Sequence, residues 1–178
     1  LLLFVAVIYV PLIAFRANIA PIKFFKAIVG AMSISFSTTS TAAAIPVTRE
    51  EVTKNLNVSE TTADLLVPLG ASLYRPGSAL FQGAAIVFLA HIYGVPIALG
   101  TVGAVLLATF LVSLTIAPVP SSSVVTMAPA LEAIGVPVAG LALMLGIDRI
   151  PDMMRSVVNV VGHVTAAVMV DRQNNGPS

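Results

Sequence analysis

Long apolar segments, separated by short polar or proline-rich stretches, make up most of this 178-residue chain. Residues 1–15 are apolar and predict the end of a membrane-spanning helix. Residues 24–44 begin apolar and end in "SISFSTTSTAAA", while 78–98 and 99–117 are again apolar. A full-length spanning helix needs about 20 apolar residues. Because several segments are shorter than that, the pattern predicts spans mixed with shorter, interrupted helices.

Three interruptions rich in Ser, Thr, Pro or Gly fall inside apolar sequence. They are the Ser/Thr-rich stretch before Pro46, "YRPG" at 74–77 and "APVPSSS" at 117–123. Non-helical backbone at membrane depth persists only where protein or a water-filled cavity satisfies its polar groups. Single Pro and Gly residues also kink ordinary spans, but paired broken helices are typical of the substrate site of a secondary transporter. Three breaks therefore favour a transporter.

The pattern divides the chain into five parts. We expect the end of a span over 1–20, a first re-entrant hairpin over 22–57, an interrupted span over 60–94, a second re-entrant hairpin over 97–134 and a last span over 137–170. Because Leu1 lies inside an apolar run, we expect a fragment that lacks its N-terminus. The polar stretch 48–64 carries helix-start signals, Thr48 followed by Glu50 and Glu51.

Composition supports an integral membrane protein, and its helical segments predict an all-α fold. The chain is 57% hydrophobic and 10% charged, whereas about 25% of residues in soluble domains are charged. No basic run precedes the first apolar segment, so a signal peptide is not expected there. The sequence has no cysteine, which excludes disulfides and thiolate metal ligands. No basic run suggests a nucleic-acid partner either.

The basic residues indicate an orientation in the membrane. Six of them lie at segment ends: Arg16, Lys23, Lys26, Arg49, Lys54 and Arg172. If the two hairpins enter from opposite faces, all six fall on one side, and the connections at 91–97 and 132–137 on the other side contain no Lys or Arg. The positive-inside rule then predicts a multi-pass protein of the cell membrane with a cytoplasmic C-terminus.

A stripe of polar residues runs along the last predicted span. Its members are Asp148, Asp152, Arg155, Ser156, Asn159 and His163. At about 100° per residue these positions share one narrow helix face. Ionisable groups inside a membrane cost at least about 2.5 kcal/mol each, so the stripe should face protein or a cavity. Asp152 and Arg155 can pair across one turn. The pair is either structural or functional, with Arg155 binding a carboxylate and Asp152 an ammonium group.

Four stretches resemble the glutamate transporter homologue family, the dicarboxylate/amino acid:cation symporters. They are "STTSTAAAIPVT" (37–48), "PLGASLYRPGSALFQG" (68–83), the tip "VP" (119–120) and "DMMRSVVNVVGH" (152–163). They occur in the family's order and cover nearly the whole chain. The resemblance implies an elevator-type transport domain with two re-entrant helical hairpins and a broken transmembrane helix. The scaffold that forms a homotrimer would lie upstream.

The resemblance also implies a substrate site. In the family's pattern Asp152 holds the substrate amino group, Arg155 reads its side-chain carboxylate, and Asn159 contacts the substrate. Ser156 stands where the family has a threonine. The implied substrate-binding residues are Ser40, Thr41, Ser78, Val119, Pro120, Asp152, Arg155, Ser156 and Asn159.

Two departures from the family's pattern affect its sodium sites. Tyr74 to Ser78 replace the family's Asn-Met-Asp-Gly-Thr, so Pro76 stands in place of an aspartate, and His163 replaces a sodium-ligating aspartate. Sodium prefers oxygen ligands, carboxylates above all. The resemblance therefore implies degraded sodium sites. Arg75 is a candidate tethered cation, unless its side chain extends to the lipid interface, and His163 is a candidate for proton coupling.

Together these features predict a secondary transporter of an acidic amino acid or dicarboxylate, independent of sodium or coupled to protons. The alternatives are a degenerate membrane protein that keeps the fold for assembly or sensing, and an anion-conducting relative. An enzyme is not expected, because the spacing places no Ser or Cys nucleophile beside His163. No cofactor and no metal ion are predicted. The expected partners are the substrate and the lipid bilayer.

Overall fold

The computed structural model describes residues 1–96, 99–113 and 120–175. All regular structure in these ranges is helical, which confirms the all-α prediction. The elements are α1 (Leu2–Phe4), the π-helical η1 (Val5–Tyr9) and η2 (Leu12–Arg16), α2 (Pro21–Ala27), α3 (Val29–Thr38), α4 (Ile45–Leu56), α5 (Glu60–Leu73), α6 (Pro76–Ile92), α7 (Leu99–Ser113), α8 (Ser122–Val125), α9 (Ala128–Ala133), α10 (Gly140–Ile147) and α11 (Arg149–Asn175).

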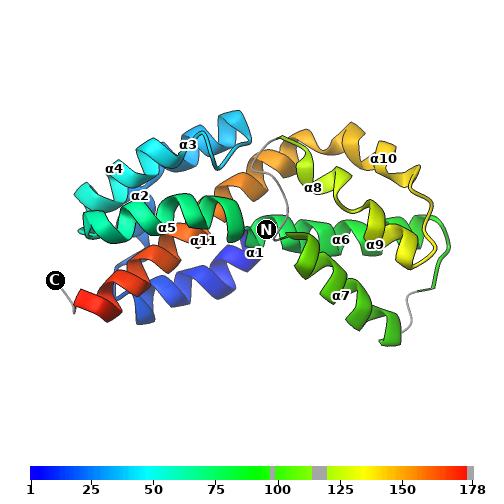
Figure 1. Ribbon diagram of the computed structural model, residues 1–178, viewed down its shortest axis with the longest axis horizontal. Helices are drawn as coiled ribbons and strands as arrows, with labels where there is room; N and C mark the ends of the chain where they lie inside the picture. The colour runs from blue at the N-terminus through cyan, green and yellow to red at the C-terminus, as the bar shows by residue number, and fades with distance from the viewer. Residues whose placement is uncertain (97–98, 114–119, 176–178) are drawn as a thin grey trace.

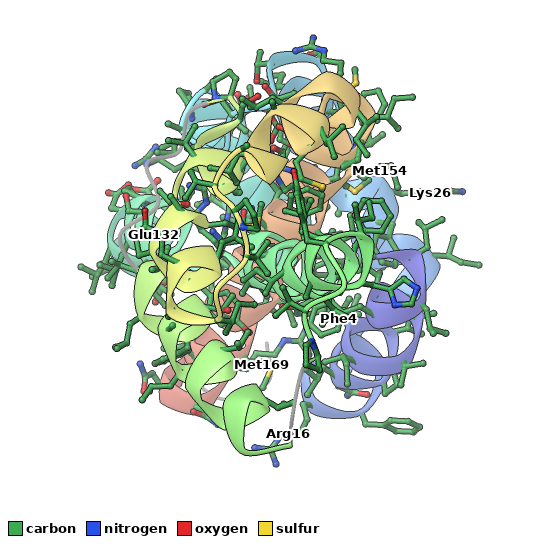
Figure 2. The ribbon with its side chains drawn as sticks, turned by 90° about the vertical axis from the view of Figure 1, so that its right-hand side faces the viewer. Phe4, Arg16, Lys26, Glu132, Met154 and Met169 are labelled. Carbon is green, nitrogen blue, oxygen red and sulfur yellow. The ribbon has the colours of Figure 1, made fainter. Side chains whose placement is uncertain are left out.

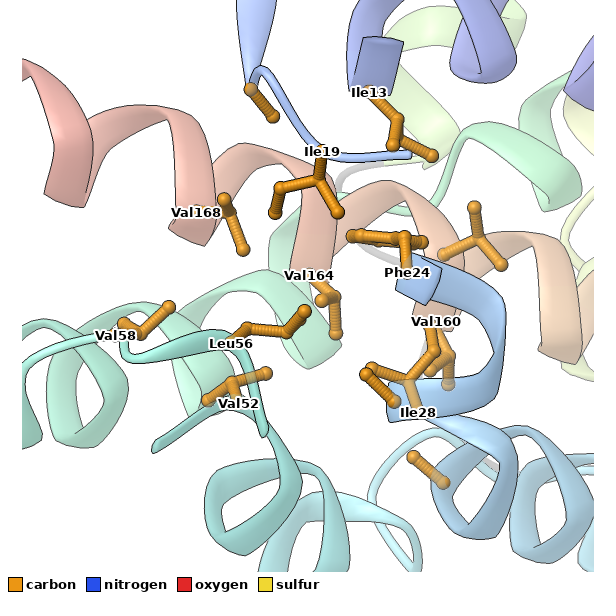
Figure 3. Close-up of a cluster of buried hydrophobic side chains, with 14 of the residues drawn as sticks. Ile13, Ile19, Phe24, Ile28, Val52, Leu56, Val58, Val160, Val164 and Val168 are labelled. Carbon is orange, nitrogen blue, oxygen red and sulfur yellow. The ribbon is translucent and has the colours of Figure 1, made fainter. Parts of the chain in front are cut away.

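The helices form two groups that meet at the middle of the molecule (Figure 1). One group contains α1 to α5, and α11 runs through it. The other contains α6 to α10. Each group has its own hydrophobic core. Phe24, Ile28 and Val164 belong to the first core, which Figure 3 shows, while Ile86 and Leu131 belong to the second. The polar stripe of α11 begins where the two groups meet.

Helix α11 is the central element of the first group. It packs against α3, α5 and α6, helices far apart in the sequence. Among the described residues, Arg149–Asn174 is the one helix with the length and hydropathy of a membrane span. The pair Leu2–Arg16 and Pro21–Ala27 passes the same test only jointly, with a bend of 99° between its halves.

The last predicted span, 137–170, is divided into α10 and α11. Pro151 explains why α10 ends at Ile147. A proline has no N–H to donate to the carbonyl four residues earlier, and its ring clashes with that carbonyl. The carbonyl four residues before Pro151 belongs to Ile147. The chain turns at Asp148 and continues as α11.

The polar stretch 48–64 begins differently from the prediction. Helix α4 starts at Ile45, with Pro46 in its first turn, and not at Thr48. Proline favours this position because the first N–H groups of a helix have no intrahelical partner. The hydroxyl of Thr48 donates to the carbonyl of Ala44 instead of capping a helix. A second helix, α5, begins after its N-cap residue Ser59. The side chain of Ser59 accepts a hydrogen bond from the backbone N–H of Thr62.

Glu51 caps a neighbouring helix. Its two carboxylate oxygens accept from the backbone N–H groups of Gly30 and Ala31, both at 2.9 Å, in the first turn of α3. A Cβ at Gly30 would lie 2.6 Å from Oε1 of Glu51, so a larger residue there would displace the carboxylate from this position. The carboxylate also complements the positive end of the α3 dipole. Glu51 thus joins α3 to α4.

Side-chain to backbone hydrogen bonds also tie helix ends together. Asn55 donates to the carbonyl of Ala27 at 2.8 Å, joining the ends of α4 and α2. Asp171 accepts from the N–H and the hydroxyl of Ser59, joining the end of α11 to the start of α5. Arg172 donates to a backbone carbonyl just after η2. These bonds bring several helix ends together at one end of the first helix group. Basic residues that the sequence places at segment ends lie there.

Replacing Glu51 with Ala should destabilise the fold. The change leaves two N–H groups of α3 without their acceptor, which costs about 1–3 kcal/mol. The measurement is the thermal unfolding midpoint of the full-length protein in detergent. Glu50→Ala is the matched control, because Glu50 is exposed and pairs with Lys54 on the same helix. Equal shifts in the two variants would contradict the capping role.

Candidate functional site

The break between α5 and α6 is satisfied by a side chain from α11. The first N–H groups of a helix lack intrahelical partners. Oδ1 of Asn159 accepts from the backbone N–H of Gly77 at 2.8 Å and of Ser78 at 3.3 Å. Nδ2 of Asn159 donates to the hydroxyl of Ser78 at 3.0 Å. Asn159 therefore caps α6 from a helix 81 or more residues away in sequence.

Gly77 allows α6 to approach α11 closely. A Cβ at this position would lie 2.6 Å from the backbone carbonyl oxygen of Arg155 and 2.9 Å from Cβ of Val158. Both obstacles belong to the rigid body of α11, so neither can yield easily. Glycine at position 77 thus sets the distance between the broken helix and the polar stripe.

The stripe contains a buried ion-pair group, which we call the Arg155 triad: Arg155, Asp148 and Asp152. Nη1 and Nη2 of Arg155 donate to the two oxygens of Asp148 at 2.6 and 2.9 Å. Nη2 also lies 2.7 Å from Oδ1 of Asp152. The guanidinium is 1% exposed. The expected Asp152–Arg155 pair is confirmed, and a second carboxylate joins it.

The triad has an aromatic neighbour on the broken helix. The guanidinium carbon of Arg155 lies 4.3 Å from the centre of the Phe81 ring, within the range of a cation–π interaction. Nε of Arg155 has no hydrogen-bond partner among the described residues. Phe81 and Asn159 together bring α6 against the stripe.

Backbone and side-chain bonds attach the α8 segment to the same place. The backbone N–H of Ser121 donates to Oδ2 of Asp152 at 2.9 Å. Ser121 has a left-handed backbone with φ of 56°. Gln82, the residue after Phe81, donates to the carbonyl of Ser123 at 2.9 Å and to the hydroxyl of Thr126 at 3.0 Å. Asp152 therefore holds both the arginine and the start of α8.

Some of the predicted substrate-binding residues contact one another in the structure, and others do not. Asp152 contacts Arg155, and Asn159 contacts Ser78. Ser156 is buried beside them, and its hydroxyl has no partner in the described ranges. Pro120 is exposed next to Ser121. Val119 lies outside the described residues.

The first predicted hairpin tip bonds to α5. The hydroxyl of Thr41 donates to the carbonyl of Ala71 at 3.0 Å, close to the end of α5. The hydroxyl of Ser40 accepts from the N–H of Ala43 within the same turn. Thr41 thus satisfies a carbonyl near the helix break.

The charge of Arg155 is neutralised within the site. Both terminal nitrogens of its guanidinium are bound by carboxylates. The physical reason is that a buried arginine without a counter-charge is too costly, and Asp148 lies two turns before it on the same face. The site is internally neutralised.

The two coupling candidates lie in different surroundings. Arg75, at the helix break, is 5% exposed, and its charge interacts with those of Asp152 and Arg155. His163 is buried in an apolar environment that includes Leu66 and Leu69. Neither ring nitrogen has a hydrogen-bond partner of ordinary geometry in the described part of the chain. A Cβ on Gly70 would lie 2.5 Å from Cβ of His163.

Sequence reasoning did not assign roles to Phe81, Gln82, Ser121 or Asp148. The spacing of Gln82 four residues after Ser78 was a usable signal, because it places both polar groups on one face of α6. Asp148 was recognised in the stripe but not as the bidentate partner of Arg155. The contribution of Ser121 comes from a backbone N–H, which side-chain identity does not reveal.

Comparison with known proteins places this arrangement in a family. The model of the sodium:dicarboxylate symporter family matches residues 1–173. Excitatory amino acid transporter 2 of Homo sapiens is 35% identical over 166 residues, which are 92% of this chain and 29% of that protein. The proton/sodium-glutamate symport protein of Bacillus subtilis is 32% identical over 171 residues, 96% of this chain and 40% of that protein.

A second Bacillus subtilis relative, the proton/glutamate-aspartate symporter, is 33% identical over 162 residues, covering 91% of this chain and 39% of the relative. The chain thus spans less than half the length of these relatives. The family match nevertheless covers almost all of the chain. The chain therefore belongs to the sodium:dicarboxylate symporter family, a family of membrane transporters and not of enzymes.

Proposed function

We propose that this chain is the transport domain of a secondary active transporter that carries an acidic amino acid by an elevator mechanism. The observation that carries the proposal is the Arg155 triad, with Asp152 also bound to the N–H of Ser121. The triad supplies a cation and an anion side by side, and Ser121 belongs to the segment that would cover the substrate. The curated relatives are named for glutamate and aspartate.

The triad could bind the substrate through an exchange of ion-pair partners. Asp148 holds Arg155 through two hydrogen bonds, whereas Asp152 shares only Nη2. A substrate carboxylate would take the place of Asp152 on Nη2. Asp152 would then accept from the substrate's ammonium group. Arg155 remains neutralised throughout, which keeps the cost of the exchange low.

This exchange distinguishes amino acids from plain dicarboxylates. An acidic amino acid replaces the partner that Asp152 loses, because its ammonium group pairs with the freed carboxylate. A dicarboxylate without an amino group leaves Asp152 buried with the Ser121 N–H but without its arginine partner. Removing one partner of a buried ion pair costs about 3–5 kcal/mol. We therefore favour the amino acid within the substrate class.

We further propose that Arg75 replaces a diffusible cation. Relative to the family's pattern, Pro76 and His163 remove two carboxylates and Arg75 adds one guanidinium, a change of about three positive charges (2 + 1) at the helix break. Sodium would lack its carboxylate ligands there. The two negative charges of Asp148 and Asp152 are matched by the two positive charges of Arg155 and Arg75. The empty site therefore needs no added cation.

Proton coupling through His163 is the weaker alternative. An imidazolium in its apolar pocket would have no hydrogen-bond acceptor of ordinary geometry among the described residues, and burying an unpaired charge is costly. Its role is better explained as packing against Gly70. The proposal therefore takes sodium-independent binding as the main expectation.

The proposal extends to topology and assembly. The predicted re-entrant hairpins would be α2 to α4 and the segment from α7 to α9, and the basic ends would face the cytoplasm together with the C-terminus. A homotrimer would form through parts of the protein outside this chain.

The first prediction tests the role of Arg155 with the double variant Arg155→Gln, Asp148→Asn. This variant removes one cation and one anion, so it leaves the number of unpaired charges unchanged. Affinity for L-aspartate should fall about 10- to 100-fold, because a charged hydrogen bond contributes about 1.5–3 kcal/mol. Titration calorimetry on the full-length protein measures the affinity.

Asp148→Asn alone is the matched control. It keeps the cation and removes the carboxylate that otherwise neutralises Arg155 beside the substrate, so L-aspartate should bind at least as tightly as to the wild type. A double variant that stays folded, judged by its unfolding midpoint, and retains wild-type affinity would rule out Arg155 as the carboxylate-binding residue.

The second prediction concerns sodium. The affinity for L-aspartate should change less than about twofold when potassium replaces sodium at constant ionic strength, because the carboxylate ligands of sodium are absent. Arg75→Met should weaken binding, and sodium should not restore it. Binding of labelled L-aspartate to the purified full-length protein measures both effects.

Arg149→Met is the control for this experiment, because Arg149 is an exposed arginine near the same site. It should leave affinity unchanged. A steep increase of wild-type affinity with sodium would contradict the tethered-cation proposal.

A further inference from the structure

A basic pocket lies at the opposite end of α11 from the Arg155 triad. Its walls come from the end of η2 and the last turns of α11, and its volume is about 390 Å³. The lining residues are Phe15, Arg16, Asn18, Met169, Arg172 and Gln173. Arg16 and Met169 both lie in the lower part of the view in Figure 2. The transport mechanism proposed above does not use this pocket.

The pocket is suited to an anion. Among the described residues it is lined by two arginines and two side-chain amides, and by no carboxylate. Arg172 is oriented by its bond to the backbone carbonyl of Ala17, whereas Arg16 is exposed and forms no hydrogen bond or ion pair with the described residues. Asp171, the neighbouring carboxylate, bonds to Ser59 and does not line the pocket.

Two grooves with mainly apolar linings adjoin this pocket along the N-terminal helix, which consists of α1, η1 and η2. The outer groove, about 360 Å³, shares Phe15 and Arg16 with the pocket and continues along Val7 and Ile8. The inner groove, about 240 Å³, lies between this helix and α11. It shares Met169 and Gln173 with the pocket. The polar pocket thus adjoins two grooves that are mainly apolar.

We propose that this region binds an anionic phospholipid, with its phosphate between Arg16 and Arg172 and one acyl chain in each groove. Arginine binds phosphate oxygens through paired hydrogen bonds. Basic pockets between membrane helices bind anionic headgroups, and aromatic residues such as Phe15 lie readily at the membrane interface. The two grooves favour a lipid over free phosphate, because free phosphate would leave both of them unused.

The inner groove reaches toward the transport site. Tyr9 and Tyr74 line its far end, and their hydroxyl oxygens are 3.4 Å apart. Tyr74 directly precedes Arg75 at the break between α5 and α6. An acyl chain in this groove would therefore contact the residue that adjoins the proposed tethered cation.

The test is lipid retention by the full-length protein in nanodiscs. Native mass spectrometry compares phosphatidylglycerol with phosphatidylcholine for the wild type and for the double variant Arg16→Gln, Arg172→Gln. Each basic residue near an anionic lipid contributes a factor of about five, so the selectivity for phosphatidylglycerol should fall about 30-fold. Lys23→Gln with Lys26→Gln is the matched control, because both lysines are exposed and lie outside the pocket (Lys26 is labelled in Figure 2).

The control should change selectivity less than about threefold, and inorganic phosphate or glycerol 3-phosphate should compete only weakly with the lipid. An equal loss in both double variants would show general surface attraction and overturn the proposal. Competition by inorganic phosphate at the affinity of the lipid would show a free-anion site and also overturn it. Failure of the wild type to retain phosphatidylglycerol selectively would show that lipid does not occupy the pocket.

Discussion

The structure depends on carboxylates that balance the positive charge of one buried arginine. Arg155 is almost completely shielded, and an arginine in that position requires counter-charges within hydrogen-bonding distance. Asp148 and Asp152 provide them from the same helix face. Because Asp152 also accepts from Ser121, the need to neutralise one guanidinium fixes the position of the α8 segment as well. The cation–π contact with Phe81 extends the same constraint to α6.

A second constraint is the broken helix. Its free N–H groups would be costly in an apolar environment, and the side chain of Asn159 satisfies them. Asn159 lies one turn after Arg155 on α11, so a single helix face supports both the ion pairs and the break. That arrangement explains how a polar stripe is retained in so apolar a chain. It also places Arg75 within electrostatic range of Asp152.

The sequence was sufficient for some of this and not for the rest. Spacing alone predicted that Asp152, Arg155 and Asn159 share a face, because helical periodicity is fixed. It also predicted a break at Tyr74–Arg75. It did not predict the division at Ile147, although Pro151 provides the reason, nor that Glu51 caps α3 and not its own helix. Both the bidentate role of Asp148 and the Ser121 N–H depend on tertiary contacts, which a one-dimensional pattern does not contain.

The central claim is that Asp152 changes its partner from Arg155 to the substrate's ammonium group. The most direct measurement is competition between L-aspartate and succinate for one binding site on the full-length protein, since the two molecules differ in the amino group. The account predicts that L-aspartate binds at least about tenfold more tightly, because succinate leaves the buried carboxylate of Asp152 without its hydrogen-bonded arginine partner. Equal affinities, or tighter binding of succinate, would contradict it.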